Sequence, residues 1–512
     1  MAFQSAATPL RGMSSGGSIS LSEVISALSF ALDLTEGAVP GHALRSCLLG
    51  MRIAEVLGLP TESLMQLYYA LLLKDVGCSS NAARMCTIVG GDDRAVKAGV
   101  KLEDWTKPHK PKLSTLRLLW NTVLPGASVA QRAARIAKIG LTQHKNNEEM
   151  ITLRCDRGAN IVTKLGIGPL ASDAVRSLDE HWDGSGYPLR LTGESIPLLA
   201  RICAVAQHLD VFATERGTQA AIDVLQQRGG AWFDPQLVRV ASSLHRNGAL
   251  WEYCTTPSHI ASLNDTRQAV LDLDPGDTSS TYGTLPASRI DQICEAFADV
   301  VDAKSPFTFR HSLGVADAAR AIAQGMHLAP HRIQLIRRAA LLHDIGKLRV
   351  PNSILDKETR LTPQERAVVE EHPALTRRIL QRVGAFQELA VVAGQHHERL
   401  DGTGYPDRLS AKDICLESRI VAVADVYSAL AEDRPYRKGL RLVEISSIME
   451  SMVPNHLDPD CTVAMIAAAA GWAEAPLESQ ISNLAPRKVA PNLASTTTDA
   501  TLGSHGLAPH SI

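Results

Sequence analysis

The sequence reads Leu341-Leu342-His343-Asp344-Ile345-Gly346-Lys347 at the point that decides the fold. The residues before it, 334–342, place apolar side chains at helical spacing, which predicts a helix. Gly346 is typical of a residue that ends a helix. The helix would therefore present an adjacent histidine and aspartate, both of which can bind metals, and then stop.

His343 and Asp344 differ in direction by about 100° if both are helical. They can therefore serve one metal ion together, or Asp344 can bridge to a second ion. Lys347 follows His343 by four residues, so we expect it on the same helical face. A single His-Asp pair indicates little alone, and its weight here comes from the rest of the chain.

The composition favours closely packed helices. Only 4% of the 512 residues are aromatic, and strands prefer aromatic and β-branched side chains, so we expect an all-α fold. The net charge of −2 gives no general attraction to nucleic-acid polymers or to anionic membranes. The nine cysteines include no C-x-x-C pair, and no apolar run approaches the length of a membrane span. These features are typical of a cytoplasmic protein with reduced thiols.

The chain repeats itself, which indicates two copies of one helical domain. Residues 182–188 (Trp-Asp-Gly-Ser-Gly-Tyr-Pro) mirror 400–406 (Leu-Asp-Gly-Thr-Gly-Tyr-Pro). His42 precedes a Lys-Asp pair by the same 32 residues that separate His311 from the His-Asp pair. The first copy carries roughly fifty extra residues between 81 and 155.

Composition shifts divide the chain further. A segment rich in Thr, Ser, Asp, Pro and Gly separates the two copies, with room for one helix in 259–273, and the ends lack periodicity. The predicted segments are a disordered N-terminus over 1–20, a first domain over 21–250, a linker over 251–286, a second domain over 287–475 and a disordered tail over 476–512.

Seven side chains of the second copy have metal-ligand chemistry. They are His311, His343, Asp344, His372, His396, His397 and Asp425. Each also has a structural interpretation, such as a helix start for His372 or a surface pair for His396-His397. A carboxylate in the apolar run around Asp425 is costly unless it is paired or bound to metal. The spacing lets separate helices point these side chains into one cavity, and Glu398 is a weaker candidate.

Two further features suit a phosphate. Gly, Thr and Pro residues in 400–406 impose a tight, exposed loop, which lets the backbone approach a phosphate closely. The run 434–438 (Arg-Pro-Tyr-Arg-Lys) supplies guanidinium groups that match phosphate oxygens, although a solvated basic face is the alternative.

The order of these motifs resembles the HD-GYP branch of the HD metal phosphohydrolases. The resemblance covers about 290–440 and rests on His343-Asp344, His396-His397-Glu398 and Gly404-Tyr405-Pro406. It implies a cyclic di-GMP phosphodiesterase of bacterial second-messenger signalling, which forms the linear dinucleotide or GMP with two or three metals, often iron or manganese. Some members carry an extra acidic ligand before the first histidine. Residues 303–310 contain none, so we expect two divalent transition metal ions.

The resemblance also implies a role for each residue. One metal would be held by His311, His343, Asp344 and Asp425, and the other by Asp344, His372, His396 and His397. Asp344 would bridge the two metals, and Lys347 would stabilise negative charge that develops on the phosphate. The residues expected to contact the substrate are Arg399, Gly404, Tyr405, Pro406, Arg434 and Arg437.

The first copy departs from this pattern. The replacements are Lys74 for His343, Cys155 near His372, Leu178-Asp179 for His396-His397, and Gln207 for Asp425. Only His42 and Asp75 persist, which predicts a degenerate domain that serves dimerisation, regulation, a signalling partner or ligand sensing. Two other functions stay open for the whole chain: hydrolysis of another nucleotide or phosphoester, and a non-enzymatic cyclic-dinucleotide receptor or scaffold.

Overall fold

The computed structural model describes residues 19–101, 113–251, 263–275, 285–306, 308, 310–433 and 438–474. Within these ranges the regular structure consists of helices and contains no strand, which confirms the all-α prediction. No helix in the described part is long and apolar enough to cross a membrane. The two termini that we predicted to be disordered lie almost entirely outside the described residues. Most of the predicted linker also lies outside them.

The first half of the chain is built around three N-terminal helices and a later central helix. Its elements are α1 (Leu21–Glu36), α2 (His42–Leu57), α3 (Thr61–Leu73), η1 (Cys78–Asn81), α4 (Ala82–Val89), α5 (Asp93–Lys101), α6 (Leu113–Thr122), α7 (Val129–Lys164), α8 (Pro169–Arg176), η2 (Gly193–Ser195), α9 (Leu198–Arg216), α10 (Thr218–Gln227), α11 (Pro235–Arg246) and η3 (Ala249–Trp251). Helices α4 to α6 and the start of α7 account for the extra residues of the first copy.

The second half repeats the plan without that insertion. Its elements are α13 (Ala287–Asp302), α14 (His311–Gly325), α15 (Pro330–Leu342), η4 (Ile345–Arg349), α16 (Asn352–Leu355), α17 (Pro363–Glu370), α18 (His372–Leu380), η5 (Gly384–Phe386), α19 (Gln387–Gly394), α20 (Leu416–Ala431), α21 (Leu442–Met452) and α22 (Pro459–Glu474). Helix α12 (Leu263–Asp272) lies in the predicted linker, where the sequence left room for one helix.

Equivalent side chains begin equivalent helices in the two halves. The carboxylate of Asp33 accepts hydrogen bonds from the backbone N–H groups of Gly41 (2.7 Å) and Ala43 (3.0 Å) at the start of α2. Asp302 accepts one from the N–H of Ser312 (3.1 Å) at the start of α14. A helix start leaves backbone N–H groups without partners. In both copies an aspartate from the preceding helix accepts hydrogen bonds from these groups.

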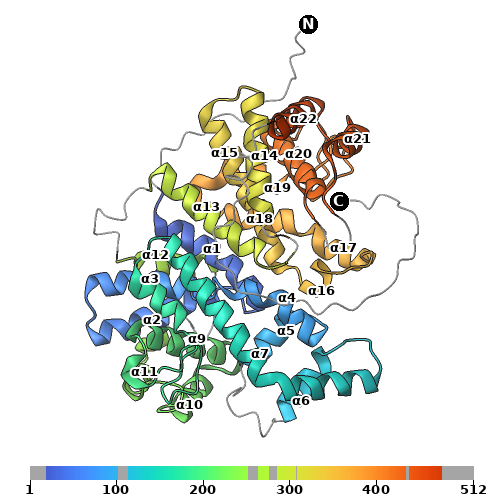
Figure 1. Ribbon diagram of the computed structural model, residues 1–512. Helices are drawn as coiled ribbons and strands as arrows, with labels where there is room; N and C mark the ends of the chain where they lie inside the picture. The colour runs from blue at the N-terminus through green and yellow to red at the C-terminus, as the bar shows by residue number, and fades with distance from the viewer. Residues whose placement is uncertain are drawn as a thin grey trace.

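The two halves share one buried core that extends from Leu21 to Ala469. Helix α1 is buried around most of its circumference and packs against η4 and α18 of the second half as well as α2 and α3 of its own. Figure 1 shows α1 in the middle of the molecule, between the helices of the first half and those from α13 onward. The first half therefore supports the loop that follows the His-Asp pair.

This packing predicts that the second half loses stability when it is separated. A fragment of residues 285–480 would expose the apolar surface that α1 covers. We expect it to melt at least about 4 °C below the full chain, the shift that a loss of 1–2 kcal/mol causes in a domain of this size. Calorimetric melting of both proteins at equal metal content measures this, and an equally stable, monomeric fragment would contradict it.

Candidate metal centre

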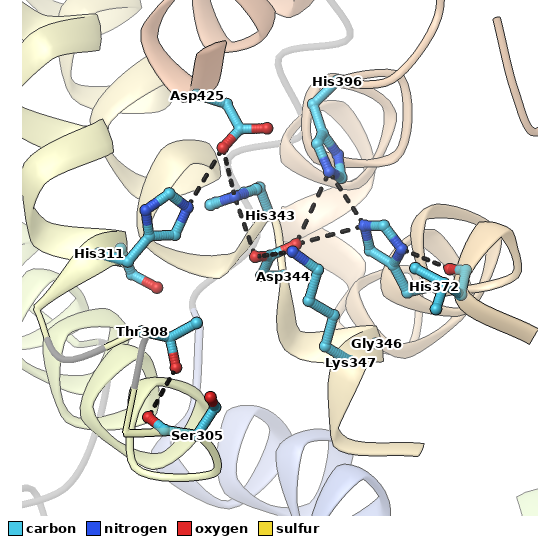
Figure 2. A network of polar contacts seen from close by, with 12 residues as sticks. Ser305, Thr308, His311, His343, Asp344, Gly346, Lys347, His372, His396 and Asp425 are labelled. Carbon is cyan, nitrogen blue, oxygen red and sulfur yellow. Dashed lines mark hydrogen bonds and ion pairs between the residues drawn. The ribbon is translucent and has the colours of Figure 1, made fainter. Parts of the chain in front are cut away.

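The seven predicted ligands lie together in one buried place. His311 begins α14, His343 and Asp344 follow α15, His372 begins α18, His396 and His397 follow α19, and Asp425 lies on α20. Their donor atoms form three overlapping groups, each within 4.8 Å: His372, His396 and His397; His311, His343 and Asp425; and His343, Asp344 and His396. Five separate elements therefore point into one cluster, as Figure 2 shows for all but His397.

Asp344 lies at the centre of the cluster. Its Oδ1 atom is 3.3 Å from Nε2 of His372 and 3.8 Å from Nε2 of His396. Its Oδ2 atom is 3.4 Å from Nε2 of His343 and 2.6 Å from the ammonium of Lys347. The two oxygens thus face two different sets of side chains, which is the arrangement that a bridging carboxylate requires.

Asp425 brings His311 and His343 together on the other side. Its Oδ1 atom is 3.2 Å from Nε2 of His311 and 3.8 Å from Nε2 of His343. Asp425 is only 6% exposed, so its charge needs compensation within the protein. This group matches the ligand set that the sequence predicted for one metal, apart from the shared Asp344.

Backbone carbonyl groups fix the orientation of three histidines. Nδ1 of each ring donates a hydrogen bond to the carbonyl oxygen three residues earlier in the chain. The pairs are His343 with Ala340 (2.7 Å), His372 with Val369 (2.6 Å) and His396 with Ala393 (2.7 Å). A carbonyl oxygen can only accept, so Nδ1 carries the proton and, in the neutral ring, Nε2 presents a lone pair to the cluster.

Glu432 fixes the orientation of the His311 ring in the same way. Both of its carboxylate oxygens lie 3.1 Å from Nδ1 of the ring. Glu432 was not predicted from the sequence. Its spacing of seven from Asp425 offered a signal, because residues seven apart share a helix face.

The electrostatics keep the ligand atoms in the states that bind metals. Burial lowers the pKa of His372 and His396, and it lowers the pKa of His397 to about 3, so these rings are neutral at pH 7. Burial opposes ionisation of Asp344 as well, but His343 and Lys347 outweigh it and hold the pKa of that carboxyl well below 3.8. Metal ligands are neutral imidazoles and ionised carboxylates, so the charge states agree.

His311 and His343 behave differently. Burial opposes protonation of His311, but its hydrogen bonds to Asp425 and Glu432 raise its pKa to about 10. The carboxylate of Asp344 raises the pKa of His343 against the effect of burial. In the protein without metal, His311 therefore holds at pH 7 a proton that a bound cation would displace.

Several donor atoms are left without a hydrogen bond. Nε2 of His372 and Nε2 of His396 lie 3.2 Å apart, and both are lone-pair atoms in the neutral rings. Among the described residues, Nε2 of His343 and Oδ1 of Asp344 are buried and have no hydrogen-bond partner. Such atoms cost about 1–3 kcal/mol each unless something satisfies them. A cation would satisfy all four, and imidazole with carboxylate suits a transition metal, so the residues fit metal ions.

The local geometry of the His-Asp stretch differs from our prediction. Helix α15 ends at Leu342, and Gly346 lies inside the 3-10 helix η4 instead of ending the α-helix. Lys347 therefore reaches Asp344 from η4 and not along one α-helical face with His343. A Cβ atom on Gly346 would collide with the carbonyl oxygen of His372, so glycine is required by close packing of η4 on α18.

Thr376 joins the same two elements, and sequence reasoning missed it. Its hydroxyl donates to the carbonyl oxygen of His343 (2.9 Å) and accepts from the N–H of Gly346 (3.0 Å). It thereby fixes the start of α18, and with it His372, against the His-Asp stretch.

The glycine-rich loop supports the histidine pair. Both carboxylate oxygens of Glu398 accept backbone hydrogen bonds, from the N–H of Asp407 (2.7 Å) and of Leu409 (2.8 Å). Glu398 therefore holds the loop, and we no longer regard it as a metal candidate. The ring of Tyr405 lies 4.8 Å from that of His397, inclined by 34°.

Part of this loop is not exposed as we expected. Gly404 is buried, and a Cβ there would collide with the backbone of Arg399. Its glycine serves contact within the chain, while phosphate contacts from Arg399, Gly404, Tyr405 and Pro406 stay a prediction. Arg434 and Arg437 lie outside the described residues.

The first copy retains the scaffold with different side chains. Glu180 accepts from the N–H groups of Leu189 (2.6 Å) and Leu191 (2.9 Å), as Glu398 does in the second copy. The ammonium of Lys74 forms a buried ion pair with Asp75, at the positions of the His-Asp pair. In the first copy a side-chain cation therefore neutralises Asp75, whereas the equivalent Asp344 of the second copy faces histidines.

Comparison with known proteins identifies the family. The sequence profile of the HD domain matches residues 129–237 and 295–461. The chain belongs to the HD domain family. It is 38% identical over 451 residues to 3'3'-cGAMP-specific phosphodiesterase 3 of Vibrio cholerae. The aligned residues make up 87% of this chain and 94% of that relative.

Other relatives of this HD domain protein extend the picture. A crystal structure of a cyclic GMP-AMP specific phosphodiesterase of V. cholerae superposes with a TM-score of 0.59 and 34% identity, over 90% of this chain and all of the other. A cyclic di-GMP phosphodiesterase of Pseudomonas aeruginosa is 39% identical over 163 residues, which are 32% of this chain and 39% of that protein. The HD domain protein is thus related to HD-GYP phosphodiesterases.

The central position of Asp344 predicts different effects for two neighbouring substitutions. Asp344→Ala should deplete most of the bound metal, because the carboxylate faces both ligand groups. Lys347→Ala should leave the metal content close to wild type, because an ammonium cannot be a ligand. Elemental analysis of protein purified with manganese measures both, with Asp75→Ala in the first copy as the matched control. Equal metal loss in both variants would mean that the role of Lys347 is misassigned.

The contact of η4 with α18 predicts a structural route to metal loss. Gly346→Ala should push η4 away from His372, lower the metal content and destabilise the protein by about 1–3 kcal/mol, as overpacking does. Gly140→Ala is a control because open space surrounds that glycine, which lies within helix α7. Denaturant unfolding and elemental analysis give the two readings, and an unchanged metal content in Gly346→Ala would contradict the packing argument.

Proposed function

We propose that this protein is a metal-dependent phosphodiesterase that hydrolyses cyclic dinucleotides. The observation that carries the proposal is the convergence of imidazole lone pairs on the carboxylate of Asp344, inside an HD domain. A pure receptor has no need to bury such atoms, since a buried acceptor without a partner destabilises the protein. The substrate class comes from the relatives, whose names describe phosphodiesterases of cyclic dinucleotides.

The chain's own residues would hold two metals as the sequence predicted. His311, His343, Asp344 and Asp425 form one ligand set, and Asp344, His372, His396 and His397 the other. When bound, such metals polarise a phosphoryl oxygen and supply an activated water. Seven ligands that include only two carboxylates leave a site with excess positive charge, which suits a phosphodiester anion.

Other groups orient these ligands and the substrate. Glu432 and Tyr405 hold the rings of His311 and His397 in position. The side chain of Lys347 is 21% exposed, and its ammonium contacts Asp344 at the edge of the cluster. It therefore places a positive charge where a phosphate oxygen of the substrate would develop negative charge.

The proposed substrate is 3'3'-cGAMP, with cyclic di-GMP as the second candidate. The sequence motifs alone favoured cyclic di-GMP. A relative named for 3'3'-cGAMP aligns with 94% of its length, whereas the P. aeruginosa cyclic di-GMP phosphodiesterase aligns with 39%. Similarity through both copies supports a shared substrate more strongly than similarity of the catalytic domain alone.

Turnover of the full chain tests the proposal. Manganese-loaded protein should hydrolyse 3'3'-cGAMP with a kcat/KM at least tenfold above that for cyclic di-GMP, a difference of about 1.4 kcal/mol in transition-state binding. Products are separated by chromatography. Lys347→Ala should lower kcat by about 10²–10³, as loss of an electrostatic donor does, whereas Asp75→Ala should leave it unchanged. A metal-loaded chain that hydrolyses neither dinucleotide would refute the proposal, and preference for cyclic di-GMP would reverse the order of substrates.

A further inference from the structure

The first copy contains a cavity of about 140 Å³ at the position of the metal centre in the second copy. Cys78, Asp179 and Gln207 line it, and these residues correspond to Lys347, His397 and Asp425. Loss of the metal ligands has thus left a space in place of a filled core. An engineered cavity of about 150 Å³ in another protein holds a benzene molecule. A cavity of this size suits one ring system.

The charged groups that line the cavity are paired with one another. The ammonium of Lys97 is 3.5 Å from the carboxylate of Glu36, and the guanidinium of Arg154 forms an ion pair with Asp179. Two cations and two anions give these groups no net charge. An anionic ligand such as a phosphate would have to compete with both carboxylates, so a neutral ligand fits better.

Amide groups supply the hydrogen-bonding capacity. Asn81 is 7% exposed, and its Nδ2 donates to the carbonyl oxygen of Met150 (2.7 Å). Its Oδ1 is buried and, within the described part of the chain, has no hydrogen-bond partner. Gln207 and Asn147 bring further amides to the lining. Amide side chains match the paired donors and acceptors at the edge of a nucleobase.

Apolar side chains provide the surfaces that a ring would contact. Met85 and Met150 line the cavity together with Ile151 and Val211. Methionine is polarizable and makes favourable contacts with aromatic rings. Enzymes that bind isolated bases combine these two elements, an apolar stack and hydrogen bonds to the base edge.

We propose that this cavity is a binding site for a neutral nitrogen heterocycle of the size of a purine base. The ligand would be the free base or the base of a nucleoside whose sugar remains outside. The proposal concerns the first copy and is separate from phosphodiester hydrolysis in the second.

The walls of the cavity continue into the catalytic half. Helix α5 carries Lys97 and also Asp93, whose carboxylate accepts a hydrogen bond from the N–H of Asn352 (3.1 Å). Arg94 on the same helix donates to the carbonyl oxygen of Arg349, the last residue of η4. Glu36 ends α1, which packs against η4. A ligand that changes the spacing of α1 and α5 would therefore act on the element that carries Lys347.

Isothermal titration of the full chain tests the binding site. The probes are adenine, hypoxanthine, adenosine and AMP. We expect saturable binding of a base or nucleoside at one site per chain, and binding of AMP at least tenfold weaker than that of adenosine. Asn81→Leu and Gln207→Leu, on two different elements, should each weaken binding at least tenfold while the melting temperature confirms a folded chain. Asp344→Ala should bind as wild type does.

Three results would overturn the proposal: no saturable binding of any probe, AMP binding as tightly as adenosine, or loss of binding in Asp344→Ala, which would place the ligand in the catalytic centre. Binding is measured without turnover, so its failure is distinct from a failure of the phosphodiesterase proposal.

The link between the cavity and the second half is tested separately, by measuring kcat. The saturating probe should change kcat at least twofold in wild type and not in Asn81→Leu, and an unchanged kcat in wild type would refute the link.

Discussion

The buried carboxylate of Asp344 is the constraint on which the rest of the centre depends. It is 2% exposed, and an ionised carboxylate in such a place is very costly unless cations or hydrogen-bond donors surround it. Three imidazole rings face it, but backbone carbonyl groups fix the protons of those rings on the far nitrogen. Lys347 offers it a permanent positive charge at close range, and the carboxylate in turn raises the pKa of His343. The scaffold thus brings several lone pairs close together, and a bound metal cation would make this arrangement favourable.

The first copy shows a second solution to the same electrostatic problem. There Asp75 is equally buried, and the ammonium of Lys74 neutralises it directly. The supporting contacts are otherwise conserved between the copies, including a glutamate that holds the Gly-Tyr-Pro loop. The residue in the place of His343 therefore supplies an internal ion pair to the buried aspartate. The space left by the missing ligands is then available for other uses.

The position of α1 connects the two halves energetically. A helix that is buried on most sides cannot remain folded when one of its partners is removed, because its apolar surface would be exposed to water. Since α1 packs against η4, the first copy contributes to the stability of the loop that carries Lys347. A degenerate domain can therefore be retained for packing even without a reaction of its own.

The sequence by itself determined the helical fold, and it indicated the repeat and the set of candidate ligands. Low aromatic content and periodic apolar residues indicate helices wherever they occur, and histidines at intervals along separate helices can be recognised without coordinates. It also indicated the loss of ligands in the first copy, because Lys74 and Gln207 cannot be mistaken for histidine and aspartate.

Only the tertiary structure decided how these residues are held. Glu432 and Thr376 act across gaps of 121 and 33 residues, on His311 and on the backbone of His343. Gly346 was misinterpreted because the atom that it must avoid belongs to His372, on another helix. The cavity of the first copy was equally invisible, since it arises from six helical elements that pack without filling the space between them. Periodicity reports what each helix presents to its surroundings, whereas the partner of each group is set by packing between segments far apart in the chain.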